Sequence, residues 1–267
     1  MRENMSKHGL NTVCQEASCP NIGDCWARGT ASIMILGDIC TRSCGFCNVR
    51  TGKPLPPDFD EPLNVGKSVA LMGLRHIVIT CVDRDDLPDG GAQIWADTIE
   101  SVHLAAPNTT VEALIGDLQG EFADLATIIA SKPEILAHNL ETVPRMQKAV
   151  RPQAMYDRSM QVLKNISESG LVCKTGIMVG IGEKDSEILT MLADIRDKTD
   201  TEIITIGQYL QPSRNHLPID RWVHPDQFEM YKDEGLKLGF RVVESGPLVR
   251  SSFHAEEQVA DYHSQQA

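Results

Sequence analysis

The chain has 267 residues, near the usual size of a single α/β barrel domain. Its formal net charge is −12 and its sequence pI is about 5.1, which argues against broad binding to nucleic acid or to an anionic membrane. No apolar run approaches the roughly 18 residues that a membrane-spanning helix needs, and the N-terminus lacks the apolar core of a signal peptide. We therefore expect a cytoplasmic protein with no nucleic-acid or membrane partner.

From residue 31 onward, short apolar runs alternate with amphipathic segments of helical spacing. The apolar runs predict strands at Ser32–Leu36, Arg75–Val82, Thr110–Ile115, Glu134–Asn139, Val172–Val179, Glu202–Leu210 and Phe240–Glu244. The amphipathic segments predict helices near Leu63–Leu74, Ala92–Ala105, Phe122–Ser131, Asp157–Ser169, Asp185–Lys198 and Pro225–Leu238. This alternation predicts a parallel sheet covered by helices, curved into a barrel or part of one, with functional residues where the strands end.

Of the 8 cysteines, all but Cys81 and Cys173 lie between residues 14 and 47, and such clustering is typical of metal binding in a reducing compartment. Cys40, Cys44 and Cys47 have the spacing C-x3-C-x2-C on a loop after the first predicted strand. Three thiolates can hold three corners of a cubane iron–sulfur cluster, which leaves one iron open to another ligand. The alternatives are a zinc site that lacks one ligand, or three unrelated thiols. Cys81 and Cys173 stand in apolar runs and are expected to pack as small apolar residues.

A second triplet, Cys14, Cys19 and Cys25, has the spacing C-x4-C-x5-C in a segment typical of an irregular loop. Two incomplete sites either pool their ligands or recruit a further ligand from elsewhere. The C-terminal stretch Val249–Ala255, with its hydroxyls and imidazole, supplies candidates for that ligand.

Polar and glycine residues follow several of the predicted strands. The second strand leads into Asp83 and the pair Gly90-Gly91. The glycines allow the backbone to approach a ligand closely, and the carboxylate can accept hydrogen bonds from an ammonium group. The fourth strand ends near Asn139 and Glu141, whose side chains suit ribose hydroxyls, while His138 is left unassigned. The fifth carries Lys174 and Gly180, and the sixth ends near Gln208.

The first triplet resembles the signature of radical S-adenosylmethionine (SAM) enzymes. Both triplets, the Val82–Gly91 run, the Gln208–Pro212 segment and Arg250-Ser251-Ser252 occur in the order typical of lipoyl synthases, which the chain resembles from about Thr12 to Ala255. The resemblance implies an α/β fold, a partial (β/α)6 TIM-like barrel of the radical SAM type with an N-terminal cluster-binding extension. It divides the chain into a second-cluster segment at 1–30, the barrel at 31–245, and a segment at 246–267 that returns to the second cluster.

The resemblance also implies an activity and its partners. Two sulfur atoms would be inserted at C6 and C8 of an octanoyl chain already linked to a lysine of a carrier domain, and SAM would supply the 5'-deoxyadenosyl radical. The implied carriers are lipoyl domains of 2-oxoacid dehydrogenase E2 subunits and the glycine cleavage H protein, and an electron donor such as ferredoxin or flavodoxin is expected.

Residue roles carry over from the same resemblance. Cys40, Cys44 and Cys47 would bind the SAM cluster; Cys14, Cys19, Cys25 and Ser252 would bind a second 4Fe-4S cluster that is consumed as sulfur donor. The candidate SAM contacts are Asp83, Gly90, Gly91, Asn139, Glu141, Lys174, Gly180 and Gln208. No acid–base residue is expected, because the chemistry takes place at the clusters. Phe253 stands where the family usually has tyrosine.

Two alternatives remain at this point: another radical SAM sulfur-inserting enzyme, similar to biotin synthase or to methylthio-transferring enzymes, and a non-catalytic metal-binding α/β scaffold. We also expect a local basic surface to receive the carrier despite the acidic balance. The densest basic stretch past the fourth strand is Arg145, Lys148, Arg151 and Arg158.

Overall fold

The computed structural model describes residues 10–12, 21–27, 30–252, 255, 257–258 and 262. The described residues divide into two compact units. Unit 1 takes those within Met1–Ser43 and Asn48–Leu136, and unit 2 takes those within Cys44–Cys47 and Ala137–Ala267. The Cys40–Cys47 motif is therefore shared between the two units.

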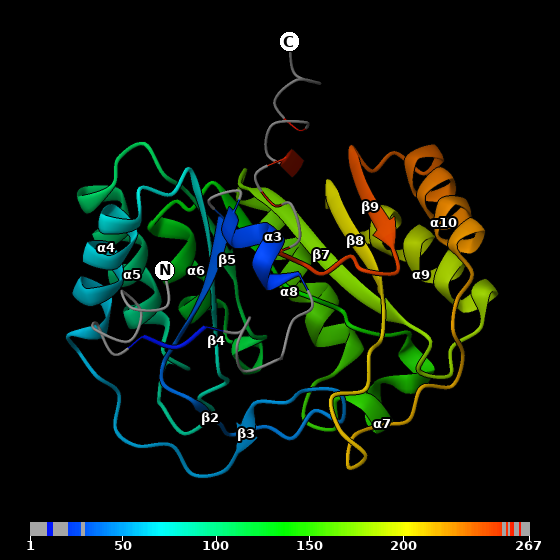
Figure 1. Ribbon diagram of the computed structural model, residues 1–267, viewed down its shortest axis with the longest axis horizontal. Coiled ribbons are helices and arrows are strands. Elements are labelled where there is room, and N and C mark those ends of the chain that lie inside the picture. Colours follow the sequence, from blue (N-terminus) through cyan, green and yellow to red (C-terminus); the bar gives the residue numbers. More distant parts are fainter. Residues whose placement is uncertain are drawn as a thin grey trace. The chain divides into compact units, whose positions relative to one another are not determined.

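Unit 1 is built on parallel strands in the order β1-β4-β5. These strands are β1 (Thr30–Ile35), β4 (His76–Cys81) and β5 (Thr110–Leu114). The helices that follow them are α4 (Glu61–Met72), α5 (Ala92–Ala105) and α6 (Phe122–Ala130), which pack on one another in sequence order (Figure 1). Shorter elements are α3 (Ile22–Ala27), β2 (Ile39–Cys40), β3 (Arg50–Thr51) and η1 (Leu118–Gly120).

The core of unit 1 follows from its apolar pattern. Every residue of β1 is buried, as expected for a strand of a parallel sheet covered on both faces. On α5, Trp95, Ile99 and Val102 lie on one face at helical spacing and are fully buried. Helix α4 ends at Gly73, which adopts a left-handed φ of 59° that glycine tolerates best. The packing of the buried strand and helix residues therefore holds the strands of unit 1 in place.

Unit 2 repeats the arrangement with parallel strands in the order β7-β8-β9. They are β7 (Val172–Val179), β8 (Ile203–Gln208) and β9 (Val242–Gly246). Its helices are α7 (Gln147–Val150), α8 (Tyr156–Glu168), α9 (Asp185–Lys198) and α10 (Pro225–Lys237), preceded by η2 (Pro144–Met146). Helix α8 packs on β7 and helix α10 on β9 (Figure 1). Strand β6 (Ile135–Ala137) lies where one unit passes into the other along the sequence.

The predicted alternation of strands and helices is confirmed in both units, and each predicted element is present within a few residues of its expected ends. The short β2–β3 ladder, η1, η2 and α7 were not predicted. Helix α3 was not predicted either: the segment around the second cysteine triplet was expected to be an irregular loop, and its described part, Ile22–Ala27, is helical. Among the described residues, no helix is long and apolar enough to cross a membrane.

Candidate metal centre and cofactor site

Cys40 ends strand β2, and backbone donors surround its sulfur within unit 1. The Cys40 Sγ accepts hydrogen bonds from the amide of Arg42 at 3.4 Å and from the amide of Asp83 at 3.3 Å. Burial raises the pKa of the Cys40 thiol, whereas both amide donors act in the opposite direction because they favour the thiolate. Such donors also stabilise the thiolate ligands of iron–sulfur clusters. The surroundings of Cys40 therefore fit an iron ligand.

A buried ion cluster fixes the loop beside Cys40. Arg42 donates two hydrogen bonds to the Asp85 carboxylate, at 2.8 and 2.7 Å, and one to Asp117 at 2.6 Å. The carboxylate of Asp83 lies 3.6 Å from the same guanidinium. Burial opposes the charge of Arg42, but these carboxylates outweigh it and raise the pKa of Arg42 above its ordinary value. Three carboxylates, those of Asp83, Asp85 and Asp117, thus face the Arg42 guanidinium.

Asp117 also shapes the turn after strand β5. Leu118, Gln119 and Gly120 adopt consecutive φ angles of 46°, 53° and 86°, a conformation that residues with side chains disfavour. The fully buried Asp117 carboxylate accepts a hydrogen bond from the Gln119 amide at 3.1 Å. One carboxylate thus holds both Arg42 of the cysteine loop and a strained turn.

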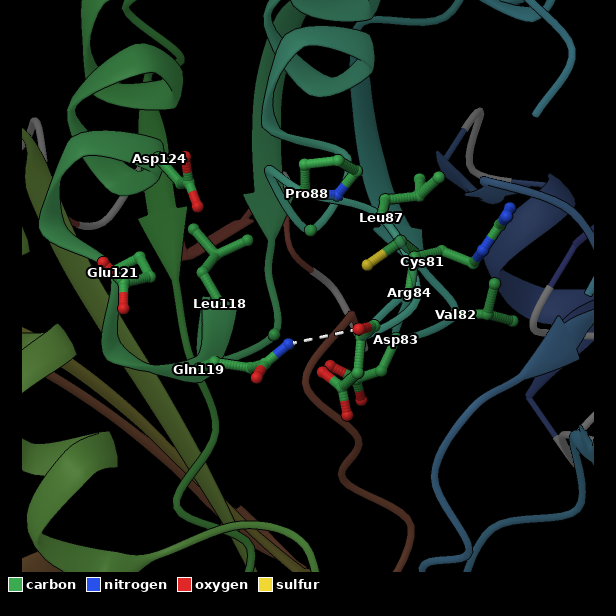
Figure 2. A pocket seen from close by; sticks show the side chains of 13 residues that line it. Cys81, Val82, Asp83, Arg84, Leu87, Pro88, Leu118, Gln119, Glu121 and Asp124 are labelled. Atoms are coloured by element: carbon green, nitrogen blue, oxygen red, sulfur yellow. Dashed lines mark hydrogen bonds between the residues drawn. The ribbon is translucent and has the colours of Figure 1, made fainter. Parts of the chain in front are cut away.

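A pocket of about 330 Å³ lies beside this cluster within unit 1, at the lower end of the range typical of small-ligand sites. Figure 2 shows its two walls, one formed by the segment that begins at Cys81 and the other by the segment that begins at Leu118. The side-chain nitrogen of Gln119 donates to the backbone carbonyl of Asp85 at 3.4 Å, the hydrogen bond drawn as a dashed line in Figure 2. Asp83 and Asp85 keep 26% and 31% of their side chains exposed, so their carboxylates are available to a cationic group.

The predicted glycine pair stands at the start of α5. Gly90 and Gly91 have φ angles of 59° and 90°, which favour glycine. A Cβ on Gly91 would lie 2.6 Å from the Leu36 side chain, and one on Gly90 would lie 3.2 Å from Leu118. Gly90 lines the pocket, whereas Gly91 packs against Leu36. Their roles as SAM contacts stay a prediction.

In unit 2, the segment Cys44–Cys47 forms a turn that is seated by its backbone. The Cys47 amide donates to the Cys44 carbonyl at 3.1 Å. The Gly45 amide donates to the Val150 carbonyl at 2.8 Å, and the Gly45 carbonyl accepts from Leu217 at 3.0 Å. A Cβ on Gly45 would lie 2.9 Å from the Leu217 side chain, so glycine permits this close approach. Two thiolates are thereby presented from a turn of defined shape.

Apolar contacts complete this seat. Phe46 packs against a cluster of buried side chains made of Val150, Ile181 and Tyr209. The Tyr209 hydroxyl donates to the Leu217 carbonyl at 2.7 Å, which ties the cluster to the loop that receives Gly45. The ring nitrogen of His216 lies 3.0 Å from the Cys47 carbonyl.

Asn139 carries a polar atom that a ligand would satisfy. Its Oδ1 is buried and has no hydrogen-bond partner among the described residues, while its nitrogen donates to Glu141 at 3.0 Å. A Cβ on Gly176 would lie 2.8 Å from that oxygen, so glycine in strand β7 permits the close approach of the Asn139 side chain. A buried acceptor without a donor is unfavourable, and a ribose hydroxyl is a donor of the required kind. The surroundings of Asn139 therefore fit the predicted nucleoside of SAM.

Glu141 lies next to Asn139 in an unusual backbone conformation. Its φ is 64°, and it pairs with Ile177 of β7 in an isolated bridge. Burial raises the pKa of the Glu141 carboxyl, although the charge of Arg151 and the Asn139 hydrogen bond act in the opposite direction. Non-glycine residues held at positive φ are frequent at ligand sites.

Gly180 and Gln208 meet at the ends of β7 and β8. A Cβ on Gly180 would lie 2.3 Å from the Gln208 amide nitrogen and 2.5 Å from the Arg221 carbonyl. The Gln208 side chain is buried; it donates to the carbonyls of Tyr209 and Arg221, each at 3.1 Å, and accepts from Val223 at 2.9 Å. Both residues hold the 209–223 loop against the strands, and contact with SAM remains a prediction for them.

The residues predicted for the second cluster are described in part. Cys14 and Cys19 lie outside the described residues, and Cys25 is half-buried on α3 of unit 1. In unit 2, Ser252 is half-buried in a turn, and the preceding Ser251 carbonyl accepts a hydrogen bond of 2.7 Å from the ammonium of Lys174. Lys174 itself is fully buried in β7.

Among the described residues, no three histidine, cysteine or acidic side chains are gathered closely enough to hold a single metal ion. The thiolates of a cubane cluster bind at separate corners and do not surround one ion. The cysteine assignments therefore stay predictions.

The basic stretch expected to receive a carrier is corrected in part. Arg151 is buried and donates to the carbonyls of Asn139 and Leu140, at 2.9 and 3.1 Å, so it serves the fold and not a docking surface. Arg145 is exposed but pairs with Glu187 at 2.7 Å. Lys148 is exposed, and Arg158 is half-buried.

Sequence reasoning missed residues that shape the site. Arg42 lies inside the cysteine motif, and Asp117 follows the third predicted strand, whose end contributed no candidate. Glu183 accepts hydrogen bonds from the amides of Gly180, Ile181 and Gly182, at 2.7, 3.0 and 3.2 Å, and so shapes the turn after β7. An acid directly after a strand and a glycine turn was the available signal in the last two cases.

Known proteins resemble this chain along nearly its whole length. The model of the Radical SAM superfamily matches residues 34–195. A mitochondrial lipoyl synthase of Nematostella vectensis is 52% identical over 260 residues, which cover 97% of this chain and 89% of that protein. The lipoyl synthase of Rubrobacter xylanophilus is 51% identical over 263 residues, or 98% of this chain and 82% of that protein.

A solved structure agrees on the fold. The crystal structure of Streptococcus suis SuiB bound to S-adenosylmethionine has a TM-score of 0.59 at 11% sequence identity, over 92% of this chain and 51% of that one. Together with the superfamily match, this likeness confirms the expected α/β fold of the radical SAM type. The matches also overturn the alternative of a non-catalytic scaffold.

Proposed function

Because this chain belongs to the lipoyl synthase family of the radical SAM superfamily, we propose that it completes lipoyl groups by inserting two sulfur atoms into a protein-bound octanoyl chain. The chain is an enzyme of the radical SAM class, and its family implies a 4Fe-4S cluster and SAM as cofactors. The enzyme class and these cofactors follow from the family, and we propose the residues that hold them.

The first cluster is assigned to Cys40, Cys44 and Cys47, with one iron left for the amino and carboxylate groups of SAM. The observation that carries this assignment is the Cys40 Sγ, which accepts two backbone amides at 3.4 and 3.3 Å. When bound, the cluster and SAM together supply a primary carbon radical, which can take hydrogen from an unactivated C–H bond. The protein would orient the thiolates through the ion cluster of Arg42, beside Cys40, and through the backbone hydrogen bonds of Gly45, beside Cys44.

The second cluster is assigned to Cys14, Cys19, Cys25 and Ser252. A serine oxygen is a harder and less common iron ligand than thiolate, and this suits a cluster that is taken apart to give up sulfur. Each insertion would replace one C–H bond with one C–S bond, and the hydrogen would leave on 5'-deoxyadenosine. The electron donor would supply one electron for each SAM cleaved. The sulfur would leave the iron of the second cluster, and that iron would take up the electron released when the carbon radical bonds to sulfide.

The partners follow from the family at a coarse level, since lipoyl synthases act on lipoyl carrier proteins. More finely, we propose octanoylated E2 subunits of 2-oxoacid dehydrogenases and the glycine cleavage H protein as carriers, with ferredoxin or flavodoxin as donor. We place the reaction in the cytoplasm, because thiolates of this kind need a reducing compartment. One of the relatives is named as mitochondrial, so an organelle is the competing location.

The test is anaerobic turnover of an octanoyl-lysine peptide with SAM and a strong reductant, followed by mass spectrometry. The proposal predicts a product that has gained two sulfur atoms and two molecules of 5'-deoxyadenosine for each product formed. A parallel reaction without SAM should leave the peptide unchanged. SAM cleavage without sulfur transfer, or transfer of a methylthio group, would overturn the proposal and favour the other radical SAM class.

A further inference from the structure

The chain after strand β9 turns back across the neighbouring strands of unit 2. The Val249 amide donates to the Gly246 carbonyl at 3.1 Å, which closes a tight turn, and the Val249 side chain is buried. In Figure 1 this segment, drawn in red, leaves β9 and runs across β8 and β7. The segment carries Arg250 and Ser251 and leads directly to Ser252.

Gly207 on β8 makes this path available. A Cβ at Gly207 would lie 2.1 Å from the Val249 carbonyl oxygen and 3.2 Å from the Arg250 guanidinium. The first contact is far shorter than any real carbon–oxygen contact, and the obstructing atom is backbone. Gly207 pairs in regular parallel register with Met178 and Gly246, and its φ is not among the positive values. Space, and not conformation, therefore requires glycine here.

Lys174 on β7 holds the next residues. Its side chain is 0% exposed, and its ammonium donates to the Ser251 carbonyl at 2.7 Å. Taking an ammonium out of water is costly unless it is hydrogen-bonded, so this contact is one that the fold must maintain. By strand alternation, Lys174 shares a face of the sheet with Met178, which pairs with Gly207.

We propose that Lys174 and Gly207 are positioning residues that seat the backbone of Val249–Ser251 and so present the Ser252 hydroxyl to the second cluster. This inference rests on the proposed function, which assigns Ser252 as a ligand. The seat consists of two complementary parts. Gly207 admits the Val249 carbonyl by having no side chain, and Lys174 reaches up to the Ser251 carbonyl two residues later. This role for Lys174 differs from the SAM contact predicted from the sequence.

The seat can be measured without any cluster. Hydrogen–deuterium exchange of the cluster-free full chain should show the Val249 amide exchanging about tenfold faster in Gly207→Ala and in Lys174→Met than in the unmutated chain. Gly246→Ala is the matched control, because its Cβ would meet only the Val249 side chain, at 3.3 Å. Ser252→Ala removes the hydroxyl and should leave exchange at Val249 unchanged.

The second readout is the cluster itself after anaerobic reconstitution. Gly207→Ala, Lys174→Met and Ser252→Ala should all lose the iron and the spectroscopic signal of the second cluster, while the first cluster should keep its own spectrum. Unchanged exchange at Val249, or retention of both clusters in the two variants, would overturn the inference. A failure of the proposed function is separable, because the second cluster would then be missing from the unmutated protein.

Discussion

The two ends of the Cys40–Cys47 motif are fixed by different interactions. In unit 1, Arg42 is one of the three residues between the first two cysteines; it is 4% exposed and bound by the carboxylates of Asp83, Asp85 and Asp117. In unit 2, Cys44–Cys47 is held by the backbone of Gly45 and by the packing of Phe46. One end depends on buried charge, and the other depends on shape.

The difference teaches how each end should fail. Removing one partner of a buried ion cluster leaves the remaining charges uncompensated, so the loss is large and abrupt. A turn held by backbone hydrogen bonds and a partly buried ring loses stability in proportion to the contact removed. Charge substitutions should therefore be most harmful near Cys40, and volume changes near Cys47.

Arg42→Met should have the largest effect, because it leaves the fully buried Asp117 without its cation. We expect a loss of about 3–5 kcal/mol in the free energy of unfolding and poor incorporation of the first cluster. Denaturant unfolding and iron analysis after anaerobic reconstitution measure the two effects. Arg42→Lys keeps the charge but loses the bidentate hydrogen bonds to Asp85, so its free energy of unfolding should lie between those of Arg42→Met and the unmutated chain. A stability equal to that of the unmutated chain would show that the ion cluster of Arg42 and its carboxylates does not anchor the cysteine loop.

Asp117→Asn and Asp85→Asn separate burial from charge within this cluster. Asp117 is 0% exposed and also holds the strained Gln119 turn, so its substitution should cost about 2–3 kcal/mol. The Asp85 side chain is 31% exposed, so Asp85→Asn should lower the free energy of unfolding by about 1 kcal/mol, since water can replace part of the lost contact. Thermal unfolding compares the pair directly. Equal losses would remove burial as the deciding factor.

Phe46→Ala tests the end that depends on shape. Loss of the ring from the Val150, Ile181 and Tyr209 cluster should cost about 1–2 kcal/mol, below the value for a fully buried phenylalanine. Phe59→Ala is the matched control: its side chain is 81% exposed, and its removal should change stability by less than about 0.5 kcal/mol. The comparison is contradicted if Phe46→Ala harms the protein as much as Arg42→Met does.

Asp185 gives the smallest effect and a pH dependence. Its carboxylate accepts from the Tyr231 hydroxyl at 2.6 Å and from Arg221 at 2.5 Å, but 41% of its side chain is exposed. Burial acts to raise the pKa of Asp185, but the hydrogen bonds from Arg221 and Tyr231 outweigh it and lower that pKa. In the unfolded chain the Asp185 carboxyl titrates at about pH 4. The stability that folded Asp185 contributes is therefore present above that pH and is lost as the pH falls through the lower pKa of the folded state.

Asp185→Asn should therefore lower the free energy of unfolding by about 0.5 kcal/mol near neutral pH. The difference from the unmutated chain should shrink as the pH is lowered below about 4. Urea unfolding at several pH values measures this difference. A difference that grows on acidification would mean that Arg221 and Tyr231 do not stabilise the ionised form of Asp185.

Much of the fold was predictable because burial and periodicity are local signals. The bounds of β7, α5 and α9 are those expected from the apolar pattern. The cysteine spacings and the polar residues at strand ends were also visible in the sequence. Each of these features repeats or clusters within a few residues, and a single sequence displays such patterns directly.

Contacts between distant residues were not predictable. Nothing local pairs Arg42 with Asp117, which lies 75 residues away, or shows that Arg151 is buried under the carbonyls of Asn139 and Leu140. Gly207 did leave a signal, since an isolated glycine inside a predicted strand often marks close approach of another backbone. What approaches it, the carbonyl of Val249, required the folded chain.

The most direct test of the central claim separates the two cysteine triplets by function. Cys40→Ala and Cys14→Ala are each supplied anaerobically with SAM, a strong reductant and an octanoyl-lysine peptide, and 5'-deoxyadenosine and product mass are measured together. We predict that Cys40→Ala forms neither 5'-deoxyadenosine nor sulfur-containing product, whereas Cys14→Ala forms 5'-deoxyadenosine and adds no sulfur. A Cys14→Ala protein that still adds two sulfur atoms would contradict the assignment of the second triplet to the sulfur donor.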